Sequence, residues 1–357
     1  MRSSNSVQTM PADLPNQLDA ALPIKGRVAG NVAAVVVNYK GWEDTIQCIK
    51  SIENSMLAPG YVVVVDNCSP NDSWQRLSQH YSRYAVAPEY RSGANDVVGH
   101  IRSQETGGEA VVRLILIRSE VNGGFGAGNN VGVRELWKRG FQGYLWVLNS
   151  DAEVFPDCLA VLKQFGDRAC LPGLIGTVLV DLDHPGRVQA CGAKMSKIGL
   201  LAKHLCEGES LEKLQADCEI TYADYPIGAS FLLHSSLLAK PDLFDERYFL
   251  YFEEVALLQR LGIQRVPIAT RAVVKHKGGA TTGAFGKPKV WNALADYHSI
   301  RSRVLFGRQC GMIPATGAII FSTAIALKRF LKVGPKAGAN ALNAVWSALR
   351  TAPTSIR

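Results

Sequence analysis

Polar side chains stand directly after three apolar runs of the sequence. Asn38 follows VAAVVV, Asp66 and Asn67 follow YVVVV, and Asn149 and Asp151 follow YLWVL. In open parallel sheets, ligands bind beyond the carboxyl ends of the strands. Asp66 could accept hydrogen bonds from a ribose or a base, or could equally form a turn or cap a helix. Asp151 could hold a divalent cation beside a diphosphate. The alternative is that Asp151 only forms an Asx turn.

A glycine-rich stretch at residues 122–132 reads NGGFGAGNNVG. Glycines at this density suit a backbone that approaches a ligand closely before a helix begins near Asn129. The stretch is not the dinucleotide fingerprint, because the GxGxxG spacing from Gly124 places Asn129 where the third glycine would stand. It also lacks the Gly-Lys-Ser/Thr of a P-loop. Hydride transfer and ATP hydrolysis are therefore disfavoured.

Four apolar runs of strand length are the elements that must position these residues. They predict strands buried on both faces, at residues 32–37, 61–65, 113–117 and 144–148. The intervening patterns predict helices at 44–56, 73–84 and 128–138. Strands that alternate with helices indicate an α/β fold, a three-layer α/β/α sandwich around a mostly parallel sheet. The polar, glycine-rich residues 88–110 are expected to form a surface insertion.

Composition and charge exclude several protein classes. The 357 residues are 47% hydrophobic and 20% charged, which excludes a disordered chain, collagen and a polytopic membrane protein. The formal net charge is +8, and no acidic residue follows Asp296. The basic excess therefore belongs to the C-terminal tail. This tail has little aromatic interleaving for base stacking, so nucleic-acid binding is not expected.

The cysteines and the N-terminus indicate a cytoplasmic protein. The eight cysteines form no CxxC pair and no Cys/His metal spacing, and we expect reduced, mostly buried thiols. Residues 1–31 are polar, without the charged-then-apolar pattern of a signal peptide, and are expected to be a flexible N-terminus.

The C-terminal tail contains an uncharged run at residues 312–327, followed at once by Lys328, Arg329 and Lys332. This run is short for a membrane-spanning helix, which needs about 20 residues. A helix that lies in the membrane interface fits the length and the flanking charge. The alternative is a buried core helix with a solvated basic tail.

Six segments occur in an order that resembles glycosyltransferase family 2, in particular its rhamnosyltransferase-like branch, over about residues 32–308. They are VVVNYKGWEDTIQCIKSI, VVVVDNCSPNDS, NGGFGAGNNVG, LWVLNSDAEV, PIGASFLLHSSLLAKPDLFDERYFLYFEEVALLQRL and VVKHKGGATTG. The resemblance implies a GT-A fold and inverting transfer of a sugar from a nucleoside diphosphate sugar, with Mg²⁺ or Mn²⁺. A nucleotide-binding half at 32–151 would precede an acceptor-binding half at 152–308 and a helical, membrane-associating tail at 309–357.

The resemblance also implies roles for individual residues. Asp151 would hold the metal ion, and His276 in VVKHKGG would complete the metal and diphosphate site; without this context His276 reads as a surface or core histidine. The donor would be bound by Asn38, Asp66, Asn67, Gly124, Phe125, Gly128, Asn129 and Asn149. The acceptor side would be shaped by Gly228, Ala229, Ser230 and Asp245, the last within an FDE segment that could be only a turn and a cap.

The catalytic base of the family is the Asp of a Glu-Asp pair, and Glu254 stands in its place after Glu253. Glu is longer by one methylene, and the family's later acid is replaced here by Ala256. Either Glu254 is the base, or Glu253 is, or the site is weakened, and a displacement of about 1 Å can lower a rate about 10²-fold. The alternative places both glutamates in a solvated first helical turn.

Two functions follow from these residues. The first is a transferase on the inner leaflet of the cytoplasmic membrane, which moves rhamnose or a related hexose from dTDP-rhamnose or a UDP-sugar. Its acceptor would be lipid-linked or a glycan, in the synthesis of a cell-surface polysaccharide. The second is a protein of the same fold that binds a nucleotide sugar and transfers it weakly or not at all.

Overall fold

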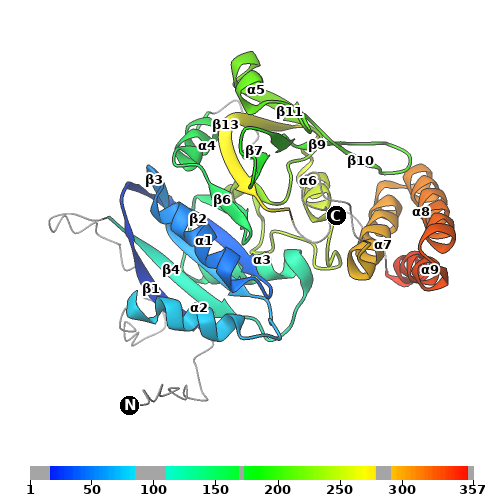
Figure 1. Cartoon of the computed structure of the whole chain (residues 1–357), viewed down its shortest axis with the longest axis horizontal. Coiled ribbons are helices and arrows are strands. Elements are labelled where there is room, and N and C mark those ends of the chain that lie inside the picture. The colour runs from blue at the N-terminus through cyan, green and yellow to red at the C-terminus, as the bar shows by residue number, and fades with distance from the viewer. Residues whose placement is uncertain (1–16, 85–109, 169–172, 279–290, 353–357) are drawn as a thin grey trace, which may run out of the picture.

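The computed structural model describes residues 17–84, 110–168, 173–278 and 291–352 (Figure 1). The predicted insertion at 88–110 lies outside the described residues except for its last residue.

An 11-stranded sheet forms the centre of the molecule. Its order along the main path is β1 (Gln17–Ile24), β4 (Ala110–Arg118), β3 (Leu57–Asp66), β2 (Arg27–Asn38), β5 (Tyr144–Asn149), β12 (Ser230–His234), β7 (Leu174–Asp181), β13 (Val266–His276) and β11 (Ile220–Ala223). Strands β4, β3, β2 and β5 are mutually parallel. The parallel sheet of the sequence analysis is thus confirmed for the first half of the chain.

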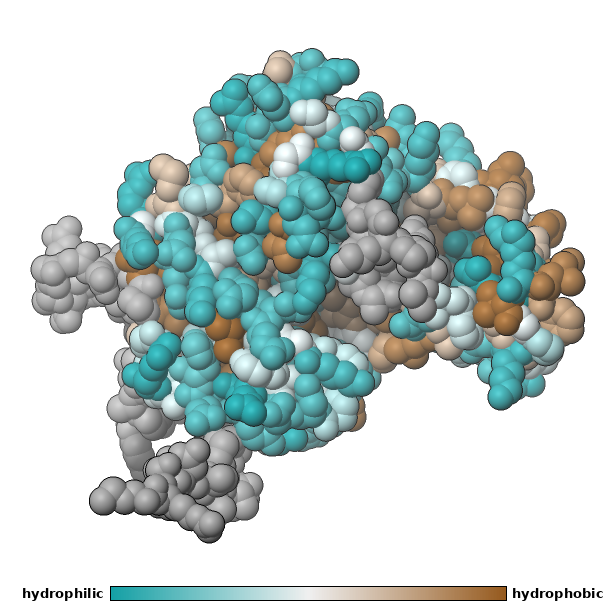
Figure 2. All heavy atoms as spheres, viewed as in Figure 1, coloured by the Kyte–Doolittle hydropathy of each residue, from teal (hydrophilic) through white to brown (hydrophobic). Residues whose placement is uncertain are grey.

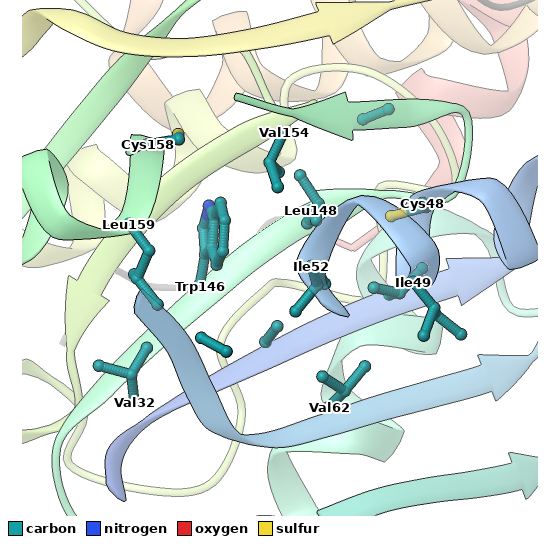
Figure 3. Packing of buried hydrophobic residues seen from close by; sticks show 14 of the residues in the cluster. Val32, Cys48, Ile49, Ile52, Val62, Trp146, Leu148, Val154, Cys158 and Leu159 are labelled. Atoms are coloured by element: carbon teal, nitrogen blue, oxygen red, sulfur yellow. The ribbon is translucent and has the colours of Figure 1, made fainter. Parts of the chain in front are cut away.

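Helices cover both faces of this parallel half, as the alternating strand residues require. On one face, Val32 and Val62 pack with Ile49 and Ile52 of α1 (Trp42–Glu53) and with Trp146 (Figure 3). On the other face, the next residues of the same strands pack on α3 (Gly124–Lys138). Successive residues of a strand point to opposite faces of the sheet. A run of valines buried on both faces therefore requires helices on each side, which gives the three layers helix, sheet and helix.

The predicted helices are present with shifted boundaries. The pattern at 73–84 forms α2 (Ser73–Tyr81) and the 3₁₀ helix η1 (Ser82–Tyr84). The helix predicted from residue 128 begins one turn earlier, because the glycine-rich residues from Gly124 are themselves helical. The glycines therefore form the first turn of α3 rather than a loop before it.

The flexible N-terminus predicted for residues 1–31 is wrong from residue 17 onward. Residues 17–24 form β1, which pairs antiparallel with β4, and β2 begins at Arg27. Ala20, Leu22 and Ile24 alternate along β1 and are buried. A short strand that contains a proline is weakly predicted from its own sequence. These residues are buried because the strand pairs with the edge of the sheet.

The second half of the chain mixes strand directions. Strand β12 is antiparallel to β5 and β7, and β13 is parallel to β7. The remaining strands are β6 (Ala152–Val154), β8 (Val188–Ala190), β9 (Ala193–Met195) and β10 (Ala202–His204). The helices here are α4 (Cys158–Gly166), α5 (Leu211–Asp217), the 3₁₀ helix η2 (Ser235–Leu237) and α6 (Glu253–Leu261).

The prediction that all cysteines are free thiols is also wrong. Cys191 and Cys206 form a disulfide, with Cα atoms 5.9 Å apart. The backbone N–H of Cys191 donates to the carbonyl of Leu205, so chain pairing brings the two sulfurs together. Cys170 lies outside the described residues, and the other cysteines are free: Cys48, Cys68, Cys158, Cys218 and Cys310.

Three helices form a separate group at one end of the molecule (Figure 1). They are α7 (Ala293–Cys310), α8 (Met312–Lys332) and α9 (Pro335–Arg350). Their small apolar side chains pack together and reach Tyr248 and Phe252 of the main domain. Among the described residues, α8 is the helix whose length and mean hydropathy are sufficient to cross a membrane.

Candidate active site

Strand pairing brings the two predicted metal-binding residues together. Asp151 lies in the turn after β5, and the next residue starts β6, which pairs antiparallel with the end of β13 so that Ala152 lies opposite His276. The Nε2 atom of His276 is 3.3 Å from Oδ1 of Asp151. It is also 3.3 Å from Nδ2 of Asn149, the last residue of β5. These three side chains therefore face one point beyond the carboxyl end of β5.

Gln189 in β8 orients the His276 ring. Its Oε1 lies 2.8 Å from Nδ1 of His276. A carbonyl oxygen only accepts hydrogen bonds, so Nδ1 carries the proton and donates it to Gln189. In the neutral ring the lone pair then lies on Nε2, where it accepts from Asn149 and faces Asp151. This is the tautomer that ligates a cation, held by an outer hydrogen bond as in many metal sites.

The donor set suits Mg²⁺ or Mn²⁺ with few protein ligands. Burial opposes the ionised form of Asp151, but the hydrogen bond and charge that His276 supplies when its ring is protonated, together with the charge of Lys277, lower the pKa of this carboxyl. The carboxylate is thus charged at neutral pH. Within the described residues no cluster of three or more His, Cys, Asp or Glu side chains could hold a metal. Asp151 and His276 offer one carboxylate oxygen and one imidazole nitrogen, and phosphate and water would supply the other ligands of an ion held there.

Glu253 and Glu254 begin α6, directly after two residues in the left-handed backbone region. Tyr251 and Phe252 both have φ of 69°. Bulky residues adopt this region at an energetic cost, and such strain clusters at functional sites. The strained pair turns the chain sharply into α6 and aims the two glutamates inward.

Glu253 is buried and Glu254 is half-buried, in contrast to the solvated helical turn considered from sequence. Glu253 is 3% exposed, and its Oε1 has no hydrogen-bond partner. Burial, then the neighbouring charge of Glu254, raises the pKa of Glu253 well above its ordinary value. Burial also raises the pKa of Glu254 to about 7, although the N–H groups of Glu254 and Gly228 donate to its carboxylate. A carboxyl group with a pKa near neutrality is suited to accept a proton at physiological pH.

A turn before β12 connects this carboxylate to the Asp151 side of the site. The carbonyl of Ala229 accepts a hydrogen bond of 2.8 Å from the N–H of Asn149. The preceding residue, Gly228, donates its own N–H to Glu254. Two adjacent residues thus contact the candidate base and the strand end that carries Asp151, so both groups lie at the same edge of the sheet.

The start of α3 closes the site from another side. Gly124 has φ of +89°, and a Cβ at this position would lie 2.1 Å from the carbonyl oxygen of Phe249. The N–H of Phe125 donates to the same carbonyl. The Phe125 ring lies near Gly228, 3.7 Å from where its Cβ would be. The glycine therefore allows α3 to approach the segment that leads into α6.

The predicted donor residues after β2 and β3 form a buried hydrogen-bond network. Asn38 donates to Asp66 at 2.7 Å, and Ser69 N–H donates to the other carboxylate oxygen of Asp66 at 3.2 Å. Asn67 donates to the carbonyl of Gly124 at 2.9 Å. This network ties the loops after both strands to α3, as a turn former would. The contact of Asp66 with a base or ribose stays a prediction.

Other predicted site residues have structural partners. Asn129 is buried and donates to the carbonyl of Phe125. A Cβ on Gly128 would lie 2.7 Å from the Val37 side chain, so this glycine allows α3 to pack on the sheet.

On the acceptor side, two predicted residues are held by other protein side chains. The Ser230 hydroxyl is buried and accepts from the indole of Trp146. Asp245 is held by the guanidinium of Arg247. Asn130 and Arg134 bind the backbone and Glu246 of the same FDE segment. This arrangement supports the reading of FDE as a structural turn.

Gln189 is the site residue that sequence reasoning missed. It is a polar residue in the short strand VQA, between two buried apolar neighbours. No motif marks it, and only the pairing of β8 with β7 places it beside β13.

Comparisons with known proteins identify no relative by sequence. No protein-family model matches the chain. No curated protein is similar to it.

Solved structures of similar backbone include S. aureus TarS 1-349 in complex with UDP-GlcNAc, at 14% identity and a TM-score of 0.49, covering 90% of this chain and 81% of that one. Another is the mannosyltransferase PcManGT from Pyrobaculum calidifontis with GDP-Man and Mn²⁺, at 13% identity and a TM-score of 0.45, covering 93% and 76%. At these identities and scores we draw nothing about function from the likeness.

Proposed function

We propose that this protein is a glycosyltransferase that moves a sugar from a nucleoside diphosphate sugar to an acceptor hydroxyl, with a divalent cation. The observation that carries the proposal is the convergence of Asp151 and His276 at the end of β5. The proposal is also supported by the position of Glu254, because the Gly228–Ala229 turn contacts both Glu254 and the end of β5. A candidate cation site and a candidate base then share one edge of the sheet.

Asp151 and His276 would hold the cation, and phosphate oxygens of the donor and water would supply its other ligands. Such an ion stabilises the negative charge that develops on the diphosphate as the glycosidic bond breaks. This role requires a neutral His276 with its lone pair on Nε2 and an ionised Asp151, and the acceptor Gln189 and the lowered pKa of Asp151 support these forms.

Glu254 is our candidate for the general base. Its pKa of about 7 suits the removal of a proton from the attacking hydroxyl. A single displacement, with the acceptor and the leaving diphosphate on opposite faces of the sugar, would invert the anomeric centre. Glu253 is buried without a partner for Oε1, and burial and the charge of Glu254 raise its pKa, so it would stay protonated beside the ionised base.

The proposal extends to the partners. The donor would be dTDP-rhamnose or a UDP-sugar, and the ion Mg²⁺ or Mn²⁺. The catalytic unit would span 17–308, with the donor bound by 17–151 together with His276 and the acceptor by 152–308. The acceptor would be lipid-linked or a glycan destined for the cell surface, reached from the inner leaflet of the cytoplasmic membrane.

A second candidate is a protein that binds a nucleotide sugar without efficient transfer. It is favoured by Ala256, which is buried against the C-terminal helices and supplies no acid in the segment after Glu254. The second candidate is also favoured by the extra methylene of Glu254, which stands where the resembled family has Asp.

A donor screen tests the first proposal. Thermal shift of the full chain with UDP-, dTDP- and GDP-sugars, with and without Mn²⁺, is expected to show a rise in Tm for one base that depends on the ion. Asp151→Asn and His276→Ala should remove the ion dependence. Asp217→Asn, an exposed carboxylate in α5, is the matched control and should keep it.

Slow, metal-dependent hydrolysis of the stabilising donor separates the two candidates. Hydrolysis supports the transferase, whereas stabilisation without turnover of any donor supports the binding protein. No stabilisation by any nucleotide sugar would remove both.

A further inference from the structure

The solvent side of α8 carries a stripe of large apolar residues. Ile313, Ile320, Leu327 and Leu331 are each between 61% and 74% exposed. Their spacing of seven, seven and four residues places them on one face of the helix. Soluble proteins rarely leave such a continuous apolar stripe uncovered, and a stripe of this kind marks an interaction surface.

A second stripe on α9 extends the surface. Leu342, Trp346 and Leu349 lie at helical spacing and are exposed. Phe330 of α8 is half-exposed and lies against α9 at Gly338, where it joins the two stripes. Figure 2 shows apolar residues gathered over this end of the molecule. We name these residues the C-terminal apolar face: Ile313, Ile320, Leu327, Phe330, Leu331, Leu342, Trp346 and Leu349.

The opposite side of α8 is packed against protein. Ala318, Ser322 and Ala326 are buried. A Cβ on Gly307 of α7 would lie 2.9 Å from the Ala318 side chain, so the two helices are in close contact. Helix α9 also packs on α8. A bilayer-spanning α8 would have to leave α7 and α9, and the structure therefore favours a helix that lies along a surface.

The charges beside the face select its partner. Residues 312–352 contain no acidic residue, and they include Lys328, Lys332, Lys336 and Arg350. Arg350 lies over the Trp346 ring, with the guanidinium carbon 4.7 Å from its centroid. Apolar residues with basic neighbours and a Trp are the composition of helices that bind anionic membrane surfaces. A second copy of the same face would bring like charges together.

We propose that the C-terminal apolar face docks on an anionic lipid membrane, with α8 and α9 lying in its plane and without a transmembrane segment. The docking itself does not depend on the glycosyltransferase activity proposed above. Only its purpose, the approach to a lipid-linked acceptor, rests on that proposed function. Both helices, rather than the uncharged run of α8 alone, form the contact.

Docking would place the active site beside the lipid surface through α7. Ser302 in α7 donates to the carbonyl of Leu250 at 2.9 Å, and Phe306 packs on Phe252 with ring centroids 5.6 Å apart. These contacts hold the segment that leads directly into Glu253 and Glu254. A loop of the main domain also joins the surface, since exposed Ile198 contacts α8 at Gly317. A lipid-linked acceptor would then be held on the same side of the main domain as α7.

Flotation of the full chain with vesicles tests the docking. Binding is expected with vesicles of phosphatidylcholine mixed with phosphatidylglycerol, and weak binding with phosphatidylcholine alone or at high salt. Leu327→Asn/Leu331→Asn should lower the partition coefficient at least about tenfold, because these side chains lose apolar area in the lipid. Trp346→Ser should lower it in the same direction, and Lys328→Gln/Lys332→Gln should remove most of the preference for anionic vesicles.

Matched controls use exposed apolar residues far from α8 and α9. Trp137→Ser in α3 and Met56→Gln before β3 should leave binding unchanged. Circular dichroism and Tm confirm that each variant is folded. Absence of wild-type binding to anionic vesicles, or an equal loss in the controls, would overturn the proposal. So would a wild-type dimer that Leu327→Asn/Leu331→Asn converts to a monomer, since the face would then join two copies of the chain.

The vesicle assay needs neither donor nor metal ion, whereas donor hydrolysis in buffer needs no vesicles. Vesicle binding without hydrolysis would refute the proposed transferase alone. Hydrolysis without vesicle binding would refute the docking alone.

Discussion

The Oε1 atom of Gln189 lies 2.8 Å from Nδ1 of His276, on the side of the ring opposite Asp151. This contact defines which nitrogen of His276 carries the proton and leaves the other free to face Asp151. Gln189 is therefore a positioning residue: it acts on the cation site through His276 and not by direct contact with a ligand.

Replacement of Gln189 by Leu should weaken Mn²⁺ binding about 10- to 100-fold, the usual effect of losing such an outer hydrogen bond. Electron paramagnetic resonance of free Mn²⁺ measures this affinity without any turnover. Gln189→Glu keeps an acceptor at the same position and should retain most of the affinity. Equal affinity in Gln189→Leu and wild type would show that β8 only supports the fold here.

Replacement of Glu254 by Gln should lower metal-dependent donor hydrolysis about 10²- to 10⁴-fold, because the general base is lost. Donor affinity, measured by thermal shift, should be unchanged. In the wild type the rate should rise with pH up to about 7 and then level, since Glu254 accepts a proton only when ionised. Exposed Glu207, changed to Gln, serves as the control. A Glu254→Gln enzyme with the wild-type pH profile would exclude Glu254 as the base.

Glu253 should make the protein less stable as the pH rises. Between its ordinary pKa of 4.5 and its raised pKa, the folded protein keeps a proton on Glu253 that the unfolded chain has released. Stability therefore falls as pH rises through this window, and Glu254 acts in the same direction up to about pH 7. Glu253→Gln removes one of these groups and should show a smaller loss of Tm between acidic and mildly alkaline pH. An unchanged loss would mean that Glu253 titrates normally.

Replacement of Gly124 by Ala should destabilise the protein by more than about 2 kcal/mol, because backbone strain and a clash act together. The new Cβ would lie 2.1 Å from the carbonyl oxygen of Phe249 at a φ of +89°. Gly140 has φ of +71° and open space around it, so Gly140→Ala measures the backbone strain alone, about 1–2 kcal/mol. Urea unfolding measures the free energy of unfolding of both variants. Equal losses would show that α3 moves away from Phe249 at little cost.

Local sequence patterns predict much of the fold. The valines of β2 and β3 could only be buried on both faces, and the isoleucines of α1 recur at helical spacing, so the layered parallel sheet was predictable. Local pattern does not predict β1, because its burial depends on the edge of β4, a partner distant in sequence. The disulfide between Cys191 and Cys206 was missed for the same reason.

The sequence by itself determined which residue types stand at the strand ends and at the start of α6: Asn149, Asp151, His276 and two adjacent glutamates. Only the tertiary structure decided that β6 pairs with β13 and so joins Asp151 to His276, and that Gln189 selects the ring nitrogen. It also decided that Glu253 is buried and Glu254 half-buried, both with raised pKa values. The reason is physical: a residue's identity is local, whereas its protonation and its partners depend on neighbours that long-range strand pairing supplies.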